Sequence, residues 1–274
     1  MNFEKKRESF EERKRKFFSK EILSVKSAFQ LHKNPGKLWD IVDGKRDWGN
    51  VSEHCLVEVV RTEEIARMVG LPDEKIRELK LGAALHDFDK RIEIEMMKEA
   101  LKNNESSSEA SDNADKIGNN YLKNAGFSKN VIEVAGSVGG KPPELFDMME
   151  ILEKEELTNQ DIARLIIHYV DGYTRGSEWV EPMDAEMNEI DCRMQKSLDN
   201  PTYQKQNKEF TSKFDSHPLL RGRGPIENEA LVCHMIEKKL AELINQKTGE
   251  TINPLELPEI IDRKIKMDIE GTEQ

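Results

Sequence analysis

The sequence has 274 residues, of which 35% are charged and 36% hydrophobic, and its formal net charge is −11, from 42 basic and 53 acidic residues. No stretch reaches the roughly 20 consecutive apolar residues that a membrane span needs, and no apolar run follows the basic N-terminus as a secretory signal requires. An acidic chain is also a poor match for an extended nucleic acid. We therefore expect a cytoplasmic protein that binds neither membranes nor extended nucleic acid.

The N-terminal part of the chain is highly charged, with apolar residues at helical intervals. This pattern predicts an amphipathic helix over residues 4–31. The apolar residues available to dock it on the rest of the chain are Phe10, Phe17, Phe18, Ile22 and Leu23. We expect an accessory helix, and binding of a partner protein is the alternative.

A second helix should begin near Asn50, because Asn50 and Glu53 have the spacing of a capping box. The apolar stripe of this helix consists of Cys55, Val59, Ala66 and Val69. His54 lies at the edge of the stripe, between core and solvent. A side chain that lines a pocket would occupy such a position.

A third helix is predicted over LPDEKIRELKLGAALHD, with Pro72 as its first helical residue. Its apolar stripe leads to His86, with Asp87 beside it, and consists of Ile76, Leu79 and Ala83. Burial of an imidazole and a carboxylate is costly unless each is paired or bound to a metal. The pair therefore predicts a site.

The helix DIARLIIHYVDGY should begin at Thr158, with Asp161 completing a capping box. It is apolar nearly all round, which predicts a central position. Its polar residues form one stripe of Arg164, His168, Asp171 and Arg175. The stripe is either a solvated face or the wall of a polar cavity, and we expect the cavity, with Asp171 and His168 beside a metal.

The remaining segments predict packing elements. Asn103–Asp115, NNESSSEASDNAD, has the composition of a polar loop that is disordered or covers the site, with disorder favoured. Residues 226–245 predict an amphipathic helix, in which His234 is a surface or packing residue. A stripe at helical spacing predicts helix packing and consists of Met183, Met187, Ile190, Met194 and Leu198.

Two imidazoles and two carboxylates in this pattern point to a metal site. The predicted ligands are His54, His86, Asp87 and Asp171. Imidazole suits zinc, iron and nickel, whereas carboxylate suits magnesium and manganese, so the identity of the divalent metal (Mn, Fe, Co, Ni, Zn or Mg) stays open. A metal with open coordination positions can hold a substrate oxygen and activate water, which predicts hydrolysis.

The segments SEHCL, LGAALHDFDK and HYVDGY resemble the HD superfamily of metal-dependent phosphohydrolases, whose members place a histidine, a His-Asp pair and a distal aspartate on separate helices. The resemblance covers roughly residues 45–180. It implies an all-α, multi-helix bundle with this metal-binding core at residues 36–180. An accessory helix at residues 1–35 and a helical extension at residues 181–274, packed on the core, would flank it.

The resemblance also implies roles for residues around the His-Asp pair. Lys90 matches a lysine that many members have three positions after the aspartate, whereas Asp89 replaces their usual glycine. Lys90 would neutralise phosphate charge during catalysis, and Asp89 or His168 would transfer protons. Arg175, Lys90 and Arg91 would bind the phosphate of the substrate.

Members with two metals carry further histidines after the His-Asp helix. Residues 111–145 of this chain contain no histidine. The resemblance therefore implies a single metal ion, and it argues against the di-iron oxygenases and the cyclic-dinucleotide phosphodiesterases of the superfamily. Among single-metal members, the chain looks like the nucleotidases and dinucleotide hydrolases.

Three functions remain open at the level of the sequence. We expect a phosphohydrolase that acts on a nucleotide or related small phosphate ester through metal-activated water. The first alternative is a non-catalytic regulatory HD protein that binds a metal and a nucleotide. The second is an interaction protein in which the metal only holds helices together. A homo-oligomer stays open in each case.

Overall fold

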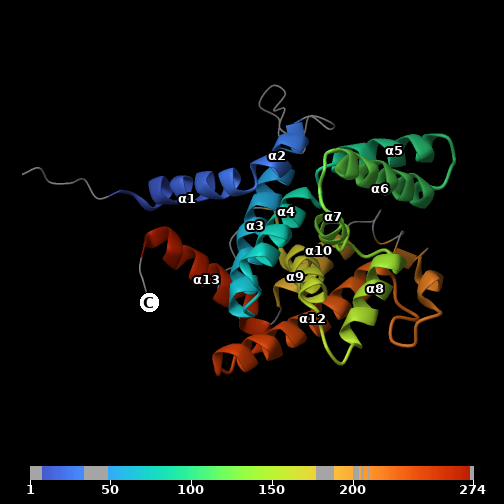
Figure 1. The fold of residues 1–274 in the computed structure, drawn as a ribbon. Coiled ribbons are helices and arrows are strands. Elements are labelled where there is room, and N and C mark those ends of the chain that lie inside the picture. The colour runs from blue at the N-terminus through green and yellow to red at the C-terminus, as the bar shows by residue number, and fades with distance from the viewer. Residues whose placement is uncertain are drawn as a thin grey trace, which may run out of the picture.

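The computed structural model describes residues 8–33, 49–176, 188–199, 204, 207, 208 and 210–271. Every regular element in these ranges is a helix, which confirms the predicted all-α class (Figure 1). None of the helices in these ranges is long and apolar enough to cross a membrane.

The N-terminal segment forms two helices, α1 (Phe10–Ser24) and α2 (Lys26–Lys33). Ser9 and Glu12 form a capping box at the start of α1. The prediction of one helix over residues 4–31 is wrong at Val25, where the buried side chain anchors a turn between the two helices. α1 lies alongside α13 and α2 packs on α4, as Figure 1 shows.

Three helices form the centre of the molecule: α3 (Gly49–Met68), α4 (Asp73–Leu85) and α9 (Asn159–Tyr173). Each contacts the other two, and α7 (Lys129–Ala135) covers α4. α9 begins at the predicted Thr158–Asp161 capping box and is buried continuously from Leu165 to Tyr173, so its predicted central position is confirmed.

Two predicted helix starts differ from the structure. α3 already includes Gly49 and Asn50, so Asn50 is a helical residue and does not cap the helix. Pro72 has extended backbone geometry and precedes α4, whose first residue is Asp73. Both shifts are one or two residues.

The segment Asn103–Asp115 is not the predicted polar loop. It contains most of the turn after α5 (Lys90–Lys102) and the first half of α6 (Ser107–Asn124), and Ser106 caps α6 by accepting a hydrogen bond from the Glu109 amide. The buried stripe of α6 consists of Ser111, Ala114, Gly118 and Leu122. Small and polar residues thus form most of the packed face, because α5 and α6 pack closely as a hairpin.

The C-terminal part contains α8 (Pro142–Leu152), α10 (Glu189–Leu198), α12 (Pro225–Thr248) and α13 (Leu257–Glu270), with short 3-10 helices η1 (Thr211–Phe214) and η2 (Pro254–Glu256). α12 packs on α8, α9 and α10. The predicted helix over residues 226–245 is confirmed. In the methionine stripe, Ile190 and Met194 are buried, whereas Met183 and Met187 lie outside the described residues. The predicted division of the chain at residues 35 and 180 stays a prediction.

A buried ion pair joins α13 to the centre. The Arg61 guanidinium on α3 donates from Nε to Asp262 Oδ1 (2.9 Å) and from Nη2 to Asp262 Oδ2 (2.7 Å). A third bond runs from Nη1 to Thr174 Oγ1 (2.9 Å) at the end of α9. Both side chains are 1% exposed. This bidentate geometry fixes α13 against α3, because loss of one partner would leave the other charge buried and unpaired.

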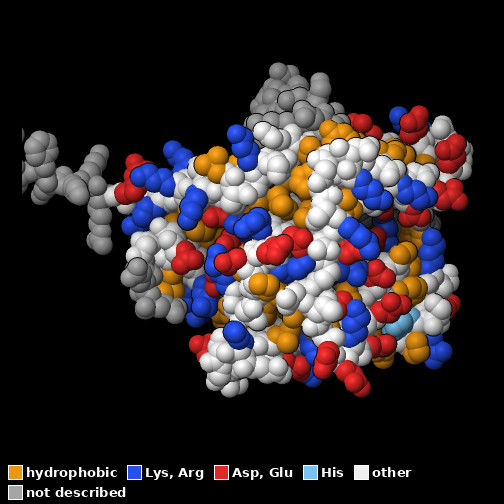
Figure 2. Space-filling model, viewed as in Figure 1, with side chains coloured by type: hydrophobic (Ala, Val, Ile, Leu, Met, Phe, Trp, Pro, Cys, Tyr) orange, Lys and Arg blue, Asp and Glu red, His pale blue; other side chains and the backbone are white. Residues whose placement is uncertain are grey.

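Acidic and basic side chains are intermixed over the face shown in Figure 2, with hydrophobic side chains between them. The basic groups on this face do not gather into one patch. The face therefore lacks the basic stripe that tracks a nucleic-acid backbone.

Candidate metal centre

Four side chains from the three central helices converge in the core. They are His54 and Glu58 on α3, His86 directly after α4, and Asp171 on α9. One ligand atom of each lies within 4.8 Å of those of the other three. We call this group the metal cluster, because it could hold a metal ion. The sequence motif contains three of its members and lacks Glu58.

Backbone carbonyls orient both imidazoles of the metal cluster. His54 Nδ1 lies 3.1 Å from the Gly176 carbonyl oxygen, and His86 Nδ1 lies 2.8 Å from the Ala83 carbonyl oxygen. A carbonyl only accepts, so each Nδ1 carries a proton, and in the neutral ring Nε2 has the lone pair. His86 Nε2 is buried without a hydrogen-bond partner among the described residues. Histidines that bind metals are oriented in this way.

Glu58 is fully buried between the two imidazoles. Its Oε1 lies 2.9 Å from His54 Nε2, and its Oε2 lies 3.3 Å from His86 Nδ1. Neither oxygen has a partner in hydrogen-bond geometry among the described residues. A buried carboxylate in this state is costly unless a cation compensates it. One Glu58 oxygen and the unpartnered Nε2 of His86 could therefore both be ligands of a divalent cation.

The electrostatics of the metal cluster also favour a positive charge. Burial alone would lower the pKa of His54, but the carboxylates of Glu58 and Asp171 raise that pKa well above its usual value. At His86, burial is likewise outweighed, chiefly by Glu58, and the pKa is well above the usual value. Without a metal the imidazoles would hold the positive charge that the carboxylates attract.

The predicted ligand Asp87 lies at the edge of the metal cluster. Its Oδ2 is 3.8 Å from His86 Nε2, whereas its Oδ1 is 3.6 Å from Lys90 Nζ. In the turn that follows α4, Asp87 points toward Lys90 while His86 points into the core. The structure thus places Glu58 inside the group and Asp87 beside it.

The predicted residues after Asp87 lie along the α5–α6 hairpin. Lys90 Nζ is 3.1 Å from Glu93 Oε2, so Lys90 bridges Asp87 and Glu93. Asp89 packs on α6: a Cβ on Gly118 would lie 1.8 Å from Asp89 Oδ2. Burial raises the pKa of Asp89 to about 7. The side chain of Arg91 lies outside the part of the chain that the structure describes.

The polar stripe of α9 divides into a buried and an ion-paired part. His168 is buried, its Nδ1 donates to the Ser137 carbonyl (2.8 Å), and its Nε2 has no partner among the described residues. Burial lowers the pKa of His168, which keeps the ring neutral. Arg164 pairs with Asp147 (2.8 Å), and Arg175 pairs with Glu189 (2.6 Å).

Arg193 on α10 is a site residue that the motif does not contain. Its Nη2 lies 3.3 Å from Asp171 Oδ1, and its Nη1 is buried without a partner among the described residues. Burial raises the pKa of Asp171, but Arg193 and then His54 outweigh that effect, so the pKa lies well below its usual value. No sequence pattern marks Arg193, because only the packing of α10 on α9 brings it to Asp171.

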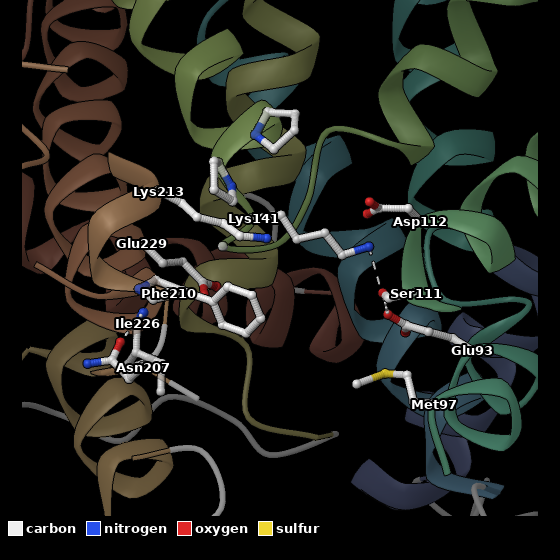
Figure 3. Close-up of a pocket in the computed structure, with 14 residues that line it drawn as sticks. Glu93, Met97, Ser111, Asp112, Lys141, Asn207, Phe210, Lys213, Ile226 and Glu229 are labelled. Atoms are coloured by element: carbon white, nitrogen blue, oxygen red, sulfur yellow. Dashed lines mark hydrogen bonds and ion pairs between the residues drawn. The ribbon is translucent and has the colours of Figure 1, made fainter. Parts of the chain in front are cut away.

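A cavity of 560 Å³ lies beside the metal cluster, between the α5–α6 hairpin on one side and α8, α12 and the segment before η1 on the other (Figure 3). The four residues of the metal cluster do not line it. Glu93 connects the two, because it lines the cavity and binds Lys90, which lies next to Asp87. We call this cavity the hairpin cavity.

No protein-family model, curated protein or solved structure matches the chain. The likeness to the HD superfamily therefore depends on the motif and on the geometry of these residues. The structure by itself shows a helical protein with a buried group that could hold a metal ion. The group consists of His54, Glu58, His86 and Asp171.

Proposed function

We propose that the protein is a metal-dependent phosphohydrolase that acts on a nucleotide or a related small phosphate ester. The observation that carries this proposal is that two cationic side chains, Lys90 and Arg193, lie beside a cluster that could hold a metal ion. Lys90 lies beside Asp87 and Arg193 beside Asp171. A purely structural metal clasp has no need of such neighbours.

His54, Glu58, His86 and Asp171 would hold the metal, with Asp87 near enough to join them. A bound divalent metal supplies a Lewis acid and lowers the pKa of water toward neutrality. The carbonyls of Gly176 and Ala83 bind Nδ1 of the two rings, which leaves each Nε2 as the nitrogen that would bind a metal. These residues would hold a metal among α3, α9 and the end of α4.

Lys90 and Arg193 would bind the phosphoryl group. Catalysis of phosphoryl transfer comes mainly from positioning and from neutralisation of charge on the phosphoryl oxygens. The free Nη1 of Arg193 is suited to this, because a buried guanidinium N–H without a partner is ready to donate to an anion. Proton transfer by Asp89 or His168 and phosphate binding by Arg175 or Arg91 stay predictions.

The test is phosphate release by the full-length protein after metal removal and resupply with Mn, Fe, Co, Ni, Zn or Mg. The substrates are nucleoside mono-, di- and triphosphates, dinucleotides and p-nitrophenyl phosphate. We expect activity with about one metal per chain and loss of both metal and activity in Asp171→Ala. Arg193→Gln should lower kcat by about a hundredfold and leave the metal content unchanged.

Arg164→Gln is the matched control for Arg193→Gln. Arg164 lies on α9, the helix that carries Asp171, but it pairs with Asp147. The kcat of Arg164→Gln should stay close to that of the unmodified protein. Absence of phosphate release with every metal and substrate would refute the proposal. Binding of a metal and a nucleotide without turnover would favour the regulatory alternative.

A further inference from the structure

The hairpin cavity is larger than a phosphate group needs. Its 560 Å³ is within the range of pockets that enclose a whole small organic molecule. Its connection to the metal cluster runs through Glu93, Lys90 and Asp87, as described above. A substrate whose phosphate lies at the metal cluster could therefore extend its organic part into the cavity.

The walls of the hairpin cavity contain flat and apolar surfaces from both sides. Met97 comes from α5, Phe210 from the segment before η1, and Ile226 from α12. Pro142 and Pro143 at the start of α8 also line it. Figure 3 shows the Phe210 ring pointing into the space between the two sides. Lys213 Nζ lies 4.5 Å from the centroid of this ring. A planar ring could stack in such a space.

The charges in the cavity oppose an anionic group. Its lining contains three carboxylates, of Glu93, Asp112 and Glu229, and two lysines, Lys141 and Lys213. Lys141 is engaged by Asp115 at 2.6 Å. A phosphate placed here would meet more acceptors than donors. The cavity is therefore suited to an uncharged group that donates hydrogen bonds.

Two of the three lining carboxylates are not engaged by other described residues; Asp112 is exposed and Glu229 is half-buried, so Glu229 is the better candidate acceptor in the cavity. Glu93 already binds Lys90 and the Ser111 hydroxyl, whereas Glu229 has no hydrogen-bond partner among the described residues. Its carboxylate lies against Gly140, where a Cβ would come within 2.8 Å of Glu229 Oε2. The missing side chain of Gly140 thus makes room for the carboxylate at the wall.

We infer that the hairpin cavity binds the base of a nucleotide, as a planar heterocycle with an exocyclic amino group that donates to Glu229. The inference rests on the proposed function for the phosphate end of the same molecule. It narrows the substrate class to phosphate esters of amino-bearing bases, as in adenosine or cytidine.

The test measures binding of nucleosides without phosphate to the full-length protein by isothermal titration calorimetry. Adenosine and purine riboside differ only in the amino group. We expect adenosine to bind at least about tenfold more tightly than purine riboside. Its amino group can donate a hydrogen bond to the Glu229 carboxylate, and purine riboside lacks that group. Glu229→Met should remove the difference. Met97→Trp should weaken adenosine binding at least about tenfold by filling the cavity.

Ile117→Trp is the matched control for Met97→Trp, because Ile117 lies on the other helix of the hairpin and is 48% exposed. The affinity of the Ile117→Trp variant for adenosine should be unchanged. Circular dichroism verifies that each variant folds. Equal binding of adenosine and purine riboside, or a difference that survives Glu229→Met, would overturn the inference.

The base-binding inference and the proposed phosphohydrolase activity can fail independently of each other. Metal-dependent release of phosphate from p-nitrophenyl phosphate without nucleoside binding would support the proposed function and overturn the base-binding inference. Adenosine binding that Met97→Trp abolishes, without phosphate release from any substrate, would support base binding in the cavity and refute the phosphohydrolase.

Discussion

Glu58 is the fully buried carboxylate of the metal cluster. Its side chain is 0% exposed, and both of its oxygens face imidazoles rather than water. Together with Asp171 it gives the cluster two negative charges in a region of low dielectric constant. A divalent cation would neutralise them, and two imidazolium rings are the only other described groups inside the cluster that can do so.

We expect Glu58→Gln to lower the affinity for the metal by at least about tenfold, because an amide removes the charge and keeps the shape. Glu64→Gln is the control: Glu64 lies on the same helix and faces Lys264 of α13 instead. Competition with a coloured chelator measures both affinities. Equal affinities for the two variants would place Glu58 outside the coordination sphere.

The motif could predict His54, His86 and Asp171 as neighbours, because each ends or interrupts an apolar stripe that must face the core. Glu58 was detectable in principle, since it follows His54 at i+4 and so shares its helical face. Arg193 was not, because its approach to Asp171 depends on how α10 packs on α9 and α12. Local spacing contains no information about that packing.

At the scale of elements, α10 and α12 are held together by a small polar network. His234 on α12 lies 3.0 Å from Asp191 on α10 and 3.3 Å from Glu237 on its own helix. Glu237 also accepts hydrogen bonds from Tyr169 and Asn188. This network positions α10, and with it Arg193, against α9.

The His234 contacts should make stability depend on pH. The hydrogen bond to Glu237, followed by the contacts with Asp191, raises the pKa of His234 from 6.5 to about 9. The stabilisation is thus complete below pH 6.5 and is lost as the pH rises through 9. We expect His234→Gln to lower the free energy of unfolding by about 1 kcal/mol at pH 6, allowing for partial exposure, and hardly at all at pH 10. Urea denaturation of both proteins measures this difference, and an equal effect at both pH values would contradict it.

The helices with strong apolar stripes could be predicted from the sequence, and α6 could not. In α9, the apolar residues and the Thr158 cap both predict a helix in the core. In α6, the packed positions include Ser111, Ala114 and Gly118, so composition alone favours a loop. The helix forms because small side chains let α5 approach closely, and that partner is not visible in a local pattern.

At the scale of the whole molecule, one hydrophobic core includes residues from α2 through α13. The helices that carry the metal cluster, α3, α4 and α9, are the centre of this core. A metal that binds the folded protein therefore stabilises a centre on which the other helices depend.

We expect metal addition to raise the melting temperature of the protein in a single transition. At a metal concentration of about 100 times the Kd, the stabilisation is about 2.7 kcal/mol, which corresponds to an increase of roughly 5–10 °C for a chain of this size. EDTA should reverse the increase, and Asp171→Ala should show none. Scanning calorimetry measures the transition, and a melting temperature insensitive to metal would argue against a cluster that binds ions.

The Arg61–Asp262 pair should also affect the rate at which the protein unfolds. Its partners are 201 residues apart in sequence, and closing a loop of that length is entropically unfavourable. We therefore expect the pair to form only after the chain between its partners has folded. An interaction that forms so late slows unfolding without hastening refolding. We therefore expect this pair, which holds α13 against the helix that carries His54 and Glu58, to slow unfolding.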